Sequence, residues 1–263
     1  MIEIIPSILT NDPVEAREML TRCEGVVERV SIDIIDGKFA ENEAPASLRL
    51  GNLLRSLNRE QNPTEAENSS HSSASSRSQF SAKADKTIDP SVFADLDTNL
   101  KLDFQLMVVE PINWIERCVR AGADRIIGHI EHMEDQLEFV GKVQETGSYV
   151  GLGVDLATPI NKLDPTILTS IDVVLVMSVP AGHGGQEFSD KVIKKIKRLS
   201  EIRDRDSTPF KIQVDGGVTV DTIYNVHKIG ADEVSVGRRI FEGDLAKNIE
   251  KFQRAAHGLE YKK

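Results

Sequence analysis

Cysteine and long hydrophobic runs are both scarce in this chain of 263 residues, and each scarcity excludes a class of protein. The only cysteines, Cys23 and Cys118, form no CxxC pair, so we expect reduced, buried thiols rather than a disulfide framework. No apolar run is long enough to cross a bilayer, and the first residues lack the features of a signal peptide. We therefore expect a cytoplasmic protein without a membrane partner.

An excess of positive charge is also missing, because the formal net charge is −10. This charge argues against a nucleic-acid partner, and a cleft that holds an anion must gather local hydrogen-bond donors against an unfavourable field. Hydrophobic residues make up 40% and charged residues 28% of the chain, as in ordinary globular proteins.

Apolar runs and amphipathic segments alternate along the chain, which predicts a (β/α)8 barrel. The runs are rich in β-branched residues, and several helical segments end on a glycine. The expected strands cover 2–8, 29–35, 102–109, 125–130, 149–154, 173–179, 211–214 and 233–237. The expected helices cover 13–23, 90–96, 112–122, 134–147, 161–170, 190–204, 220–230 and 244–256. A doubly wound open sheet is the rival, but the first strand is followed by PSILTNDP rather than a glycine-rich fingerprint.

One segment interrupts this alternation, from Glu43 to Asp85. It contains SLRLGNLLRSLN, which could form one short helix, and then NSSHSSASSRSQFSAKAD, which has almost nothing to bury. We predict a single barrel domain over 1–263, interrupted by a largely disordered insertion over 43–85.

Polar residues stand where the expected strands end, and in this fold chemistry belongs at the carboxyl ends of the strands. Asp33 alternates with apolar neighbours in its strand, so it is expected to point into the mouth of the barrel, and Asp215 ends the seventh strand before two glycines. Asp36 precedes Gly37, a pattern that is typical of a turn. The other polar or pocket residues at strand ends are Ser7, Gln105, Met107, His129, Glu131, Asp155, Met177, Ser178 and Arg238.

Glycine loops follow the last three expected strands and form a second group of candidate site residues. The loops read PAGHGGQEF, DGGV and VGRRIF, and contain Gly182, Gly184, Gly185, Gly216, Gly217 and Gly237. Glycines let backbone N–H groups converge on an anion, and barrels of this kind commonly hold a phosphate after strands seven and eight. Arg238 could add a charge-assisted contact, although an arginine here could equally be a solvated surface residue.

The following motifs occur in order along the chain: IIPSIL, SIDIIDGKFAEN, FQLMVVEP, GHIE, VMSVPAGHGGQEF, VDGGV and VGRRIF. With these motifs the chain resembles the ribulose-phosphate 3-epimerase family over its whole length except 43–85. The resemblance implies proton transfer at C3 of a ketopentose phosphate, with Asp33 and Asp215 as the acid–base pair on opposite faces of the carbon. It also implies a pocket lined by Ser7, Met107 and Met177, and a phosphate held by the glycine loops. Homo-oligomers occur in the family, and no organic cofactor is implied.

The chain departs from the family at the metal site. The family holds a divalent metal with two histidines and two aspartates, and Ser31 and Gln105 stand where those histidines are expected. Only Asp33 and Asp215 remain as strong metal ligands, so zinc affinity should collapse, although an oxygen-only site for a harder ion stays open. Lys38 also replaces a common histidine, and His129 is expected in the pocket as a hydrogen-bonding group rather than a ligand.

Three functions stay open at this point. The first is a sugar-phosphate epimerase with a weakened or dispensable metal. The second is a related decarboxylase or synthase that acts on a keto-sugar phosphate, although its Asp-x-Lys signature is not found on the third strand, where FQLMV stands. The third is a non-catalytic binder, against which the two retained aspartates argue, because a binder gains nothing from two repelling carboxylates.

Overall fold

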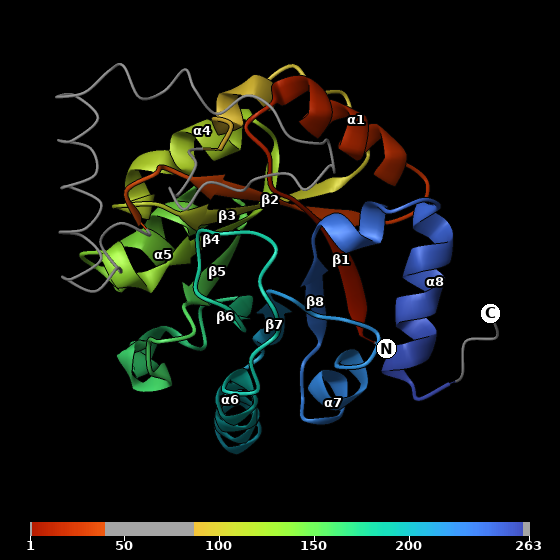
Figure 1. Ribbon diagram of the computed structural model, residues 1–263. Coiled ribbons are helices and arrows are strands. Elements are labelled where there is room, and N and C mark those ends of the chain that lie inside the picture. The colour runs from red at the N-terminus through yellow and green to blue at the C-terminus, as the bar shows by residue number, and fades with distance from the viewer. Residues whose placement is uncertain (1, 40–86, 260–263) are drawn as a thin grey trace, which may run out of the picture.

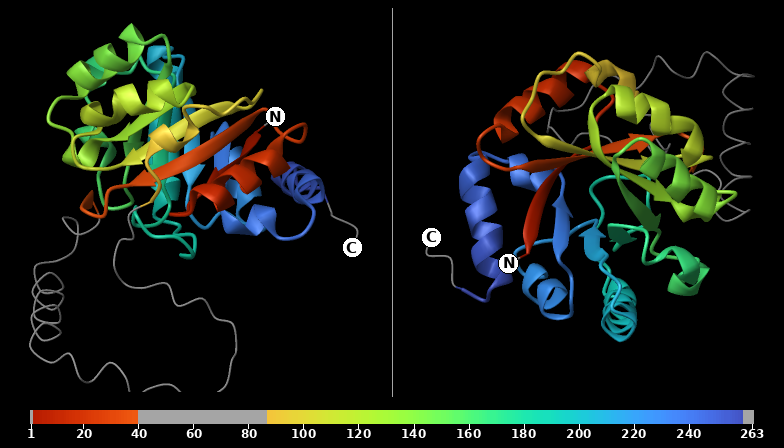
Figure 2. Two further views of the ribbon diagram at one scale, coloured as in Figure 1. Left: turned by 90° about the horizontal axis from the view of Figure 1, so that it is seen from above. Right: turned by 180° about the vertical axis from the view of Figure 1, so that it is seen from behind.

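The computed structural model describes residues 2–39 and 87–259, and its parallel strands close into a barrel in sequence order. The proposed insertion over 43–85 lies outside the described residues. Helices cover the outside of the ring of strands, as Figure 1 and the two views of Figure 2 show. The strands are β1 (Glu3–Ile8), β2 (Arg29–Ile35), β3 (Lys101–Met107), β4 (Ala123–His129), β5 (Tyr149–Val154), β6 (Val173–Met177), β7 (Lys211–Asp215) and β8 (Glu233–Val236).

The helices begin and end at residues whose chemistry suits those positions. Asp12 caps the first helix by accepting a hydrogen bond from the backbone N–H of Val14 at 2.8 Å. Gly122, Gly147 and Gly230 follow helices with positive φ, as the sequence predicts. The α-helices are α1 (Pro13–Cys23), α4 (Ile115–Arg120), α5 (Gln136–Glu145), α6 (Val192–Asp206), α7 (Ile223–Lys228) and α8 (Leu245–Ala256).

Several expected helices are short 3-10 turns, and the expectation of a helix over 161–170 is wrong. Asp164 caps a 3-10 turn there that begins at Pro165. Proline is tolerated in the first turn of a helix but not in its interior, so Pro165 separates this turn from the preceding one. The 3-10 elements are η2 (Pro90–Phe93), η3 (Pro111–Trp114), η4 (Ile130–His132), η5 (Ile160–Lys162), η6 (Pro165–Ile167) and η7 (Arg238–Phe241).

A network of buried charges fills the barrel interior toward the amino ends of the strands. Arg125 lies at its centre and donates to Glu233 Oε2 at 2.8 Å and, through Nε, to Asp103 Oδ2 at 3.0 Å. Lys211 Nζ adds a 2.7 Å contact to Glu233 Oε1, and Arg29 pairs with Asp103. Burial raises the pKa of Asp103 to about 6, and the neighbouring guanidinium groups oppose that shift. Removing one member would leave a buried charge unpaired, so the network fixes the base of the barrel.

Apolar side chains separate the helices from the strands and also fill part of the upper barrel. Ile35, Met107, Leu175 and Met177 pack together there. Cys23 and Cys118 are buried and unpaired with each other, as expected, and burial raises the pKa of both thiols. Among the described residues, no helix combines the length and the apolar character that crossing a bilayer requires.

Candidate active site

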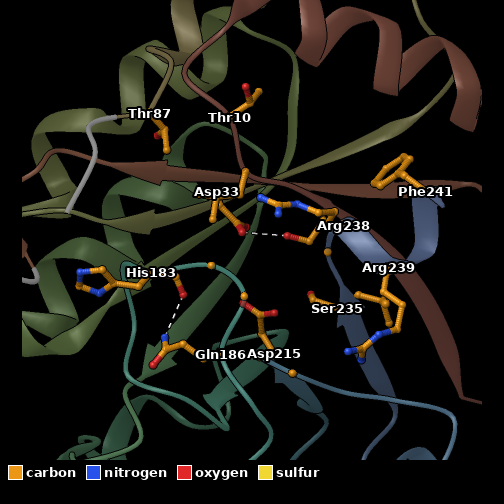
Figure 3. Close-up of a pocket in the computed structure, with 18 of the residues that line it drawn as sticks. Thr10, Asp33, Thr87, His183, Gln186, Asp215, Ser235, Arg238, Arg239 and Phe241 are labelled. Carbon is orange, nitrogen blue, oxygen red and sulfur yellow. Dashed lines mark hydrogen bonds between the residues drawn. The ribbon is translucent and has the colours of Figure 1, made fainter. Parts of the chain in front are cut away.

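A cavity of about 1090 Å³ opens at the carboxyl ends of the strands. Asp33 enters it from β2 and Asp215 from β7, and the two residues are only 6% and 8% exposed (Figure 3). Both aspartates line the cavity, so the structure brings together the two carboxyls that the sequence singles out.

Asp33 is held by hydroxyl groups. Ser7 Oγ donates to its Oδ2 at 2.8 Å, and Ser31 Oγ lies 3.4 Å from its Oδ1. Burial and the nearby Asp215 carboxylate raise the pKa of Asp33 well above its ordinary value, and the two serine hydrogen bonds only partly oppose this. Burial and the nearby carboxylate therefore favour the protonated form of Asp33 more than they would for an exposed aspartate.

Asp215 is held by donors that favour its ionised form. Burial raises the pKa of Asp215 to about 6, while hydrogen bonds from the Gln105 side chain and the Gly216 backbone N–H act in the opposite direction. Two carboxyl groups with separated proton affinities can serve as an acid and a base in one reaction. The structure therefore raises the pKa of both carboxyls and places hydrogen-bond donors that favour the ionised form against Asp215.

Gln105 presents its amide nitrogen to its neighbours. Its Nε2 lies 3.2 Å from His129 Nε2 and also donates to Asp215. His129 Nδ1 lies 3.3 Å from Glu131 Oε2, so a proton on Nδ1 would face that carboxylate and leave Nε2 to accept from Gln105. Gly153 leaves room for this ring, because a Cβ there would lie 2.6 Å from it.

This polarity does not fit the metal site that the family resemblance implies. A cation needs electron pairs, but the side chain from β3 turns an N–H donor toward Asp215 and is held so by His129. Ser31 supplies only a hydroxyl, which already contacts Asp33. The described residues contain no group of three or more histidine, cysteine, aspartate or glutamate side chains placed to hold a metal ion.

The glycine loops border the cavity on the side of β6, β7 and β8. Gly182, Gly185, Gly216 and Gly217 have positive φ, a backbone conformation that glycine adopts without strain. The loops after β6 and β7 touch, because a Cβ on Gly217 would lie 2.5 Å from the backbone nitrogen of Phe188. Glycine loops packed in this way can present backbone N–H groups to an anion.

Arg238 extends into the cavity from the end of β8, and Arg239 also lines the cavity (Figure 3). Arg239 donates to the backbone oxygen of Val218 at 3.3 Å, which connects the last two glycine loops. Asp155 accepts a 2.6 Å hydrogen bond from the backbone N–H of Ala181 and so holds the loop after β6.

Most of the site residues expected from the sequence line the cavity. These are Ser7, Asp33, Met107, Met177, Gly182, Gly184, Gly185, Asp215, Gly216, Gly217, Gly237 and Arg238. Gln105 and His129 are fully buried and are not among the described residues that line it. Asp36 forms a turn, as the glycine after it suggests, by accepting from the backbone N–H groups of Lys38 and Phe39 at 2.8 and 2.9 Å.

Sequence reasoning missed Ser235, which lines the cavity from β8. A signal was available in the run EVSVG, where Glu233 and Ser235 alternate with valines in a strand that is otherwise apolar. Polar residues at alternate positions of such a strand point to the inside of the barrel.

Comparison with known proteins identifies the family. The ribulose-phosphate 3 epimerase family matches residues 85–241. The chain belongs to this family. It is 34% identical to the ribulose-phosphate 3-epimerase of Aquifex aeolicus over 161 residues, which cover 61% of this chain and 71% of that protein. It is 31% identical to the enzyme of that name from Candida glabrata over 245 residues, covering 90% of this chain and 85% of that protein. This membership makes the chain an isomerase of the epimerase type.

Solved structures show how widely the fold is shared. An orotidine 5'-phosphate decarboxylase from Pyrococcus horikoshii matches with a TM-score of 0.56 over 98% of this chain and all of that one. The two chains are only 15% identical, so the likeness establishes the barrel and says nothing about the reaction.

Proposed function

We propose that this epimerase-family protein interconverts ribulose 5-phosphate and xylulose 5-phosphate by proton transfer at C3. The observation that carries the proposal is the pair of buried carboxyls, Asp33 and Asp215, which enter one cavity from different strands beside three glycine loops. The loops and Arg238 bind the phosphate, which places the sugar carbons over the carboxyls.

The ionised Asp215 removes the proton from C3, and the electron pair moves toward the C2 carbonyl to give an enediolate. Asp33, whose burial favours the protonated form, then delivers its proton to the opposite face of C3. One proton is gained by Asp215 and one is lost by Asp33. Exchange with water in the open cavity restores the starting state, and the reverse reaction uses the two groups in exchanged roles.

Three groups prepare the carboxyls for this transfer. Ser7 orients Asp33 by its 2.8 Å hydrogen bond, and Gln105, held by His129, donates to Asp215. Because Gln105 replaces a strong ligand with a weak neutral donor, we expect a slower enzyme than one that has a Lewis acid at this position, with the same reaction. We therefore expect the reaction to continue in the presence of a chelator.

Incubation of the purified protein with ribulose 5-phosphate tests the proposal. Proton NMR should show xylulose 5-phosphate accumulating to a fixed ratio that is the same from either sugar. A protein that binds the sugar phosphate without interconverting the two sugars is a non-catalytic binder, and this result would overturn the proposal. Release of CO₂ from a keto-acid sugar phosphate, with no epimerisation, would instead identify the decarboxylase alternative.

A further inference from the structure

A directed chain of hydrogen bonds connects the buried charges of the barrel to the floor of the cavity. Arg125 Nη2 donates to Gln213 Oε1 at 3.2 Å, and Gln213 Nε2 donates to Ser235 Oγ at 2.8 Å. All three side chains are buried. A guanidinium cannot accept a hydrogen bond, so Gln213 must turn its oxygen to Arg125 and its nitrogen to Ser235.

This direction determines what Ser235 can offer. Its oxygen already accepts from Gln213, so the hydroxyl hydrogen must point elsewhere. The hydrogen bonds among the described residues include no acceptor for it, and neither Asp33 nor Asp215 is bonded to it. Since Ser235 lines the cavity, its hydroxyl hydrogen is available to a ligand that binds there.

The place of Ser235 in the barrel defines which ligand atoms it can reach. On one side it pairs in register with Asp215 of β7, and on the other with Ile5 of β1. The strand β1 also carries Ser7, which is bonded to Asp33. Ser235 therefore lies between the two carboxyl-bearing sides of the site, and Figure 3 shows it next to Asp215. A substrate carbon that lies between the two carboxyls places either its own oxygen or the oxygen of the adjacent carbon near the Ser235 hydroxyl.

We propose that Ser235 donates a hydrogen bond to a substrate oxygen on C2 or C3, and that Gln213 is the positioning residue that sets its direction. This inference rests on the proposed epimerase function. Both oxygens gain electron density in the enediolate, so the bond strengthens as the proton leaves C3. Gln105 is buried and does not line the cavity, so it is not placed to stabilise this charge directly. Ser235 thereby provides part of that stabilisation.

A phosphorylated four-carbon hydroxamate, which mimics the planar enediolate, is the probe for this contact. Its dissociation constant is measured by calorimetry for the wild type, Ser235→Ala, Gln213→Glu and the double variant. Gln213→Glu keeps a partner for Arg125 but offers Ser235 an acceptor, so the hydroxyl hydrogen turns away from the cavity. Val234→Ala, on the same strand but packed in the apolar layer outside the barrel, is the control for lost packing.

We expect hydroxamate affinity to fall about 10²-fold in Ser235→Ala and in Gln213→Glu, in the range found for losing one oxyanion donor. The double variant should bind no more weakly than Ser235→Ala, because both changes remove one contact. Inorganic phosphate should bind all variants equally, and Val234→Ala should bind the hydroxamate normally. Hydroxamate affinity within threefold of wild type in Ser235→Ala would overturn the contact, and additive losses would overturn the positioning role.

Turnover of ribulose 5-phosphate by the wild type, measured in parallel, separates this inference from the proposed function. An active wild type with hydroxamate binding that is insensitive to Ser235→Ala overturns the inference alone. An inactive wild type whose hydroxamate binding depends on Ser235 overturns the epimerase function and supports the contact. A wild type that neither turns over the sugar phosphate nor binds the hydroxamate overturns both.

Discussion

The proposed reaction needs Asp215 in its ionised form, and burial destabilises that form. Its folded-state pKa of about 6 exceeds the ordinary aspartate value of 3.8, so between these two values the folded protein retains a proton that the unfolded chain releases. The stabilisation from this proton is fully present below the unfolded pKa and is lost as the pH rises through the folded pKa. The free energy of unfolding should therefore fall as the pH rises from about 4 toward neutrality.

Asp215→Asn should remove this dependence and stabilise the protein while abolishing catalysis. A pKa difference of about two corresponds to on the order of 3 kcal/mol at pH 8, and to roughly half of that at pH 5. Urea unfolding at the two pH values measures the gain. The exposed Asp97→Asn is the matched control and should change stability little at either pH. A variant that is less stable than wild type at pH 8 would show that the ionised carboxylate is better solvated than its surroundings indicate.

The loops at the ends of the strands form the proposed phosphate contact, and Gly237 is the position that best tests it. A Cβ at Gly237 would meet only the backbone oxygen of Ser7, at 4.0 Å, so a side chain can be added there without displacing the backbone. A substitution at Gly217 would not separate loss of binding from loss of folding, because Gly217 has a positive φ and packs closely against the loop after β6.

Gly237→Glu should weaken phosphate and sugar-phosphate binding by at least tenfold, since it places bulk and negative charge at the cradle. Thermal protection by phosphate is the measurement, and it should be strong in wild type and absent in Gly237→Glu. Gly141→Glu, on the open face of α5, is the control and should keep the protection. Equal protection of both variants would place the anion elsewhere.

The sequence is enough to predict the barrel, because each of the eight apolar runs forms a strand and the strands close in chain order. The short connecting turns are not predictable at that level, since a segment such as 161–170 has helical spacing but is divided by Pro165. Asp33 and Asp215 are found because acids in apolar strands are conspicuous. The inward amide of Gln105 and the donor of Ser235 depend on partners such as Arg125 from distant strands, which no local pattern contains.

At the scale of the whole molecule, described residues on either side of the proposed insertion lie next to each other. Thr87 donates its backbone N–H to the Ile35 oxygen at 3.0 Å and accepts from the Ile35 N–H through its hydroxyl at 2.8 Å. The chain after the proposed insertion is therefore anchored to the end of the strand that precedes it. The family match also begins at residue 85, where the proposed insertion ends.

Deletion of residues Glu43–Asp85, joining Asn42 to Lys86, should leave folding intact. A segment that buries little contributes little to the core, and loop length changes closure entropy only slowly. Circular dichroism during heating should show a midpoint within a few degrees of wild type. Failure to fold, or a midpoint many degrees lower, would show that the segment packs against the barrel.

Exchange of the C3 proton of ribulose 5-phosphate with deuterium, followed by NMR in heavy water with a chelator present, tests the account most directly. We predict that the wild type exchanges this proton despite the chelator, and that Asp33→Asn and Asp215→Asn each slow exchange by at least about 10²-fold, because each face of C3 needs its own proton carrier. Wild-type exchange that stops with the chelator and returns with a divalent ion would contradict the metal argument. Normal exchange in both variants would contradict the two-aspartate mechanism itself.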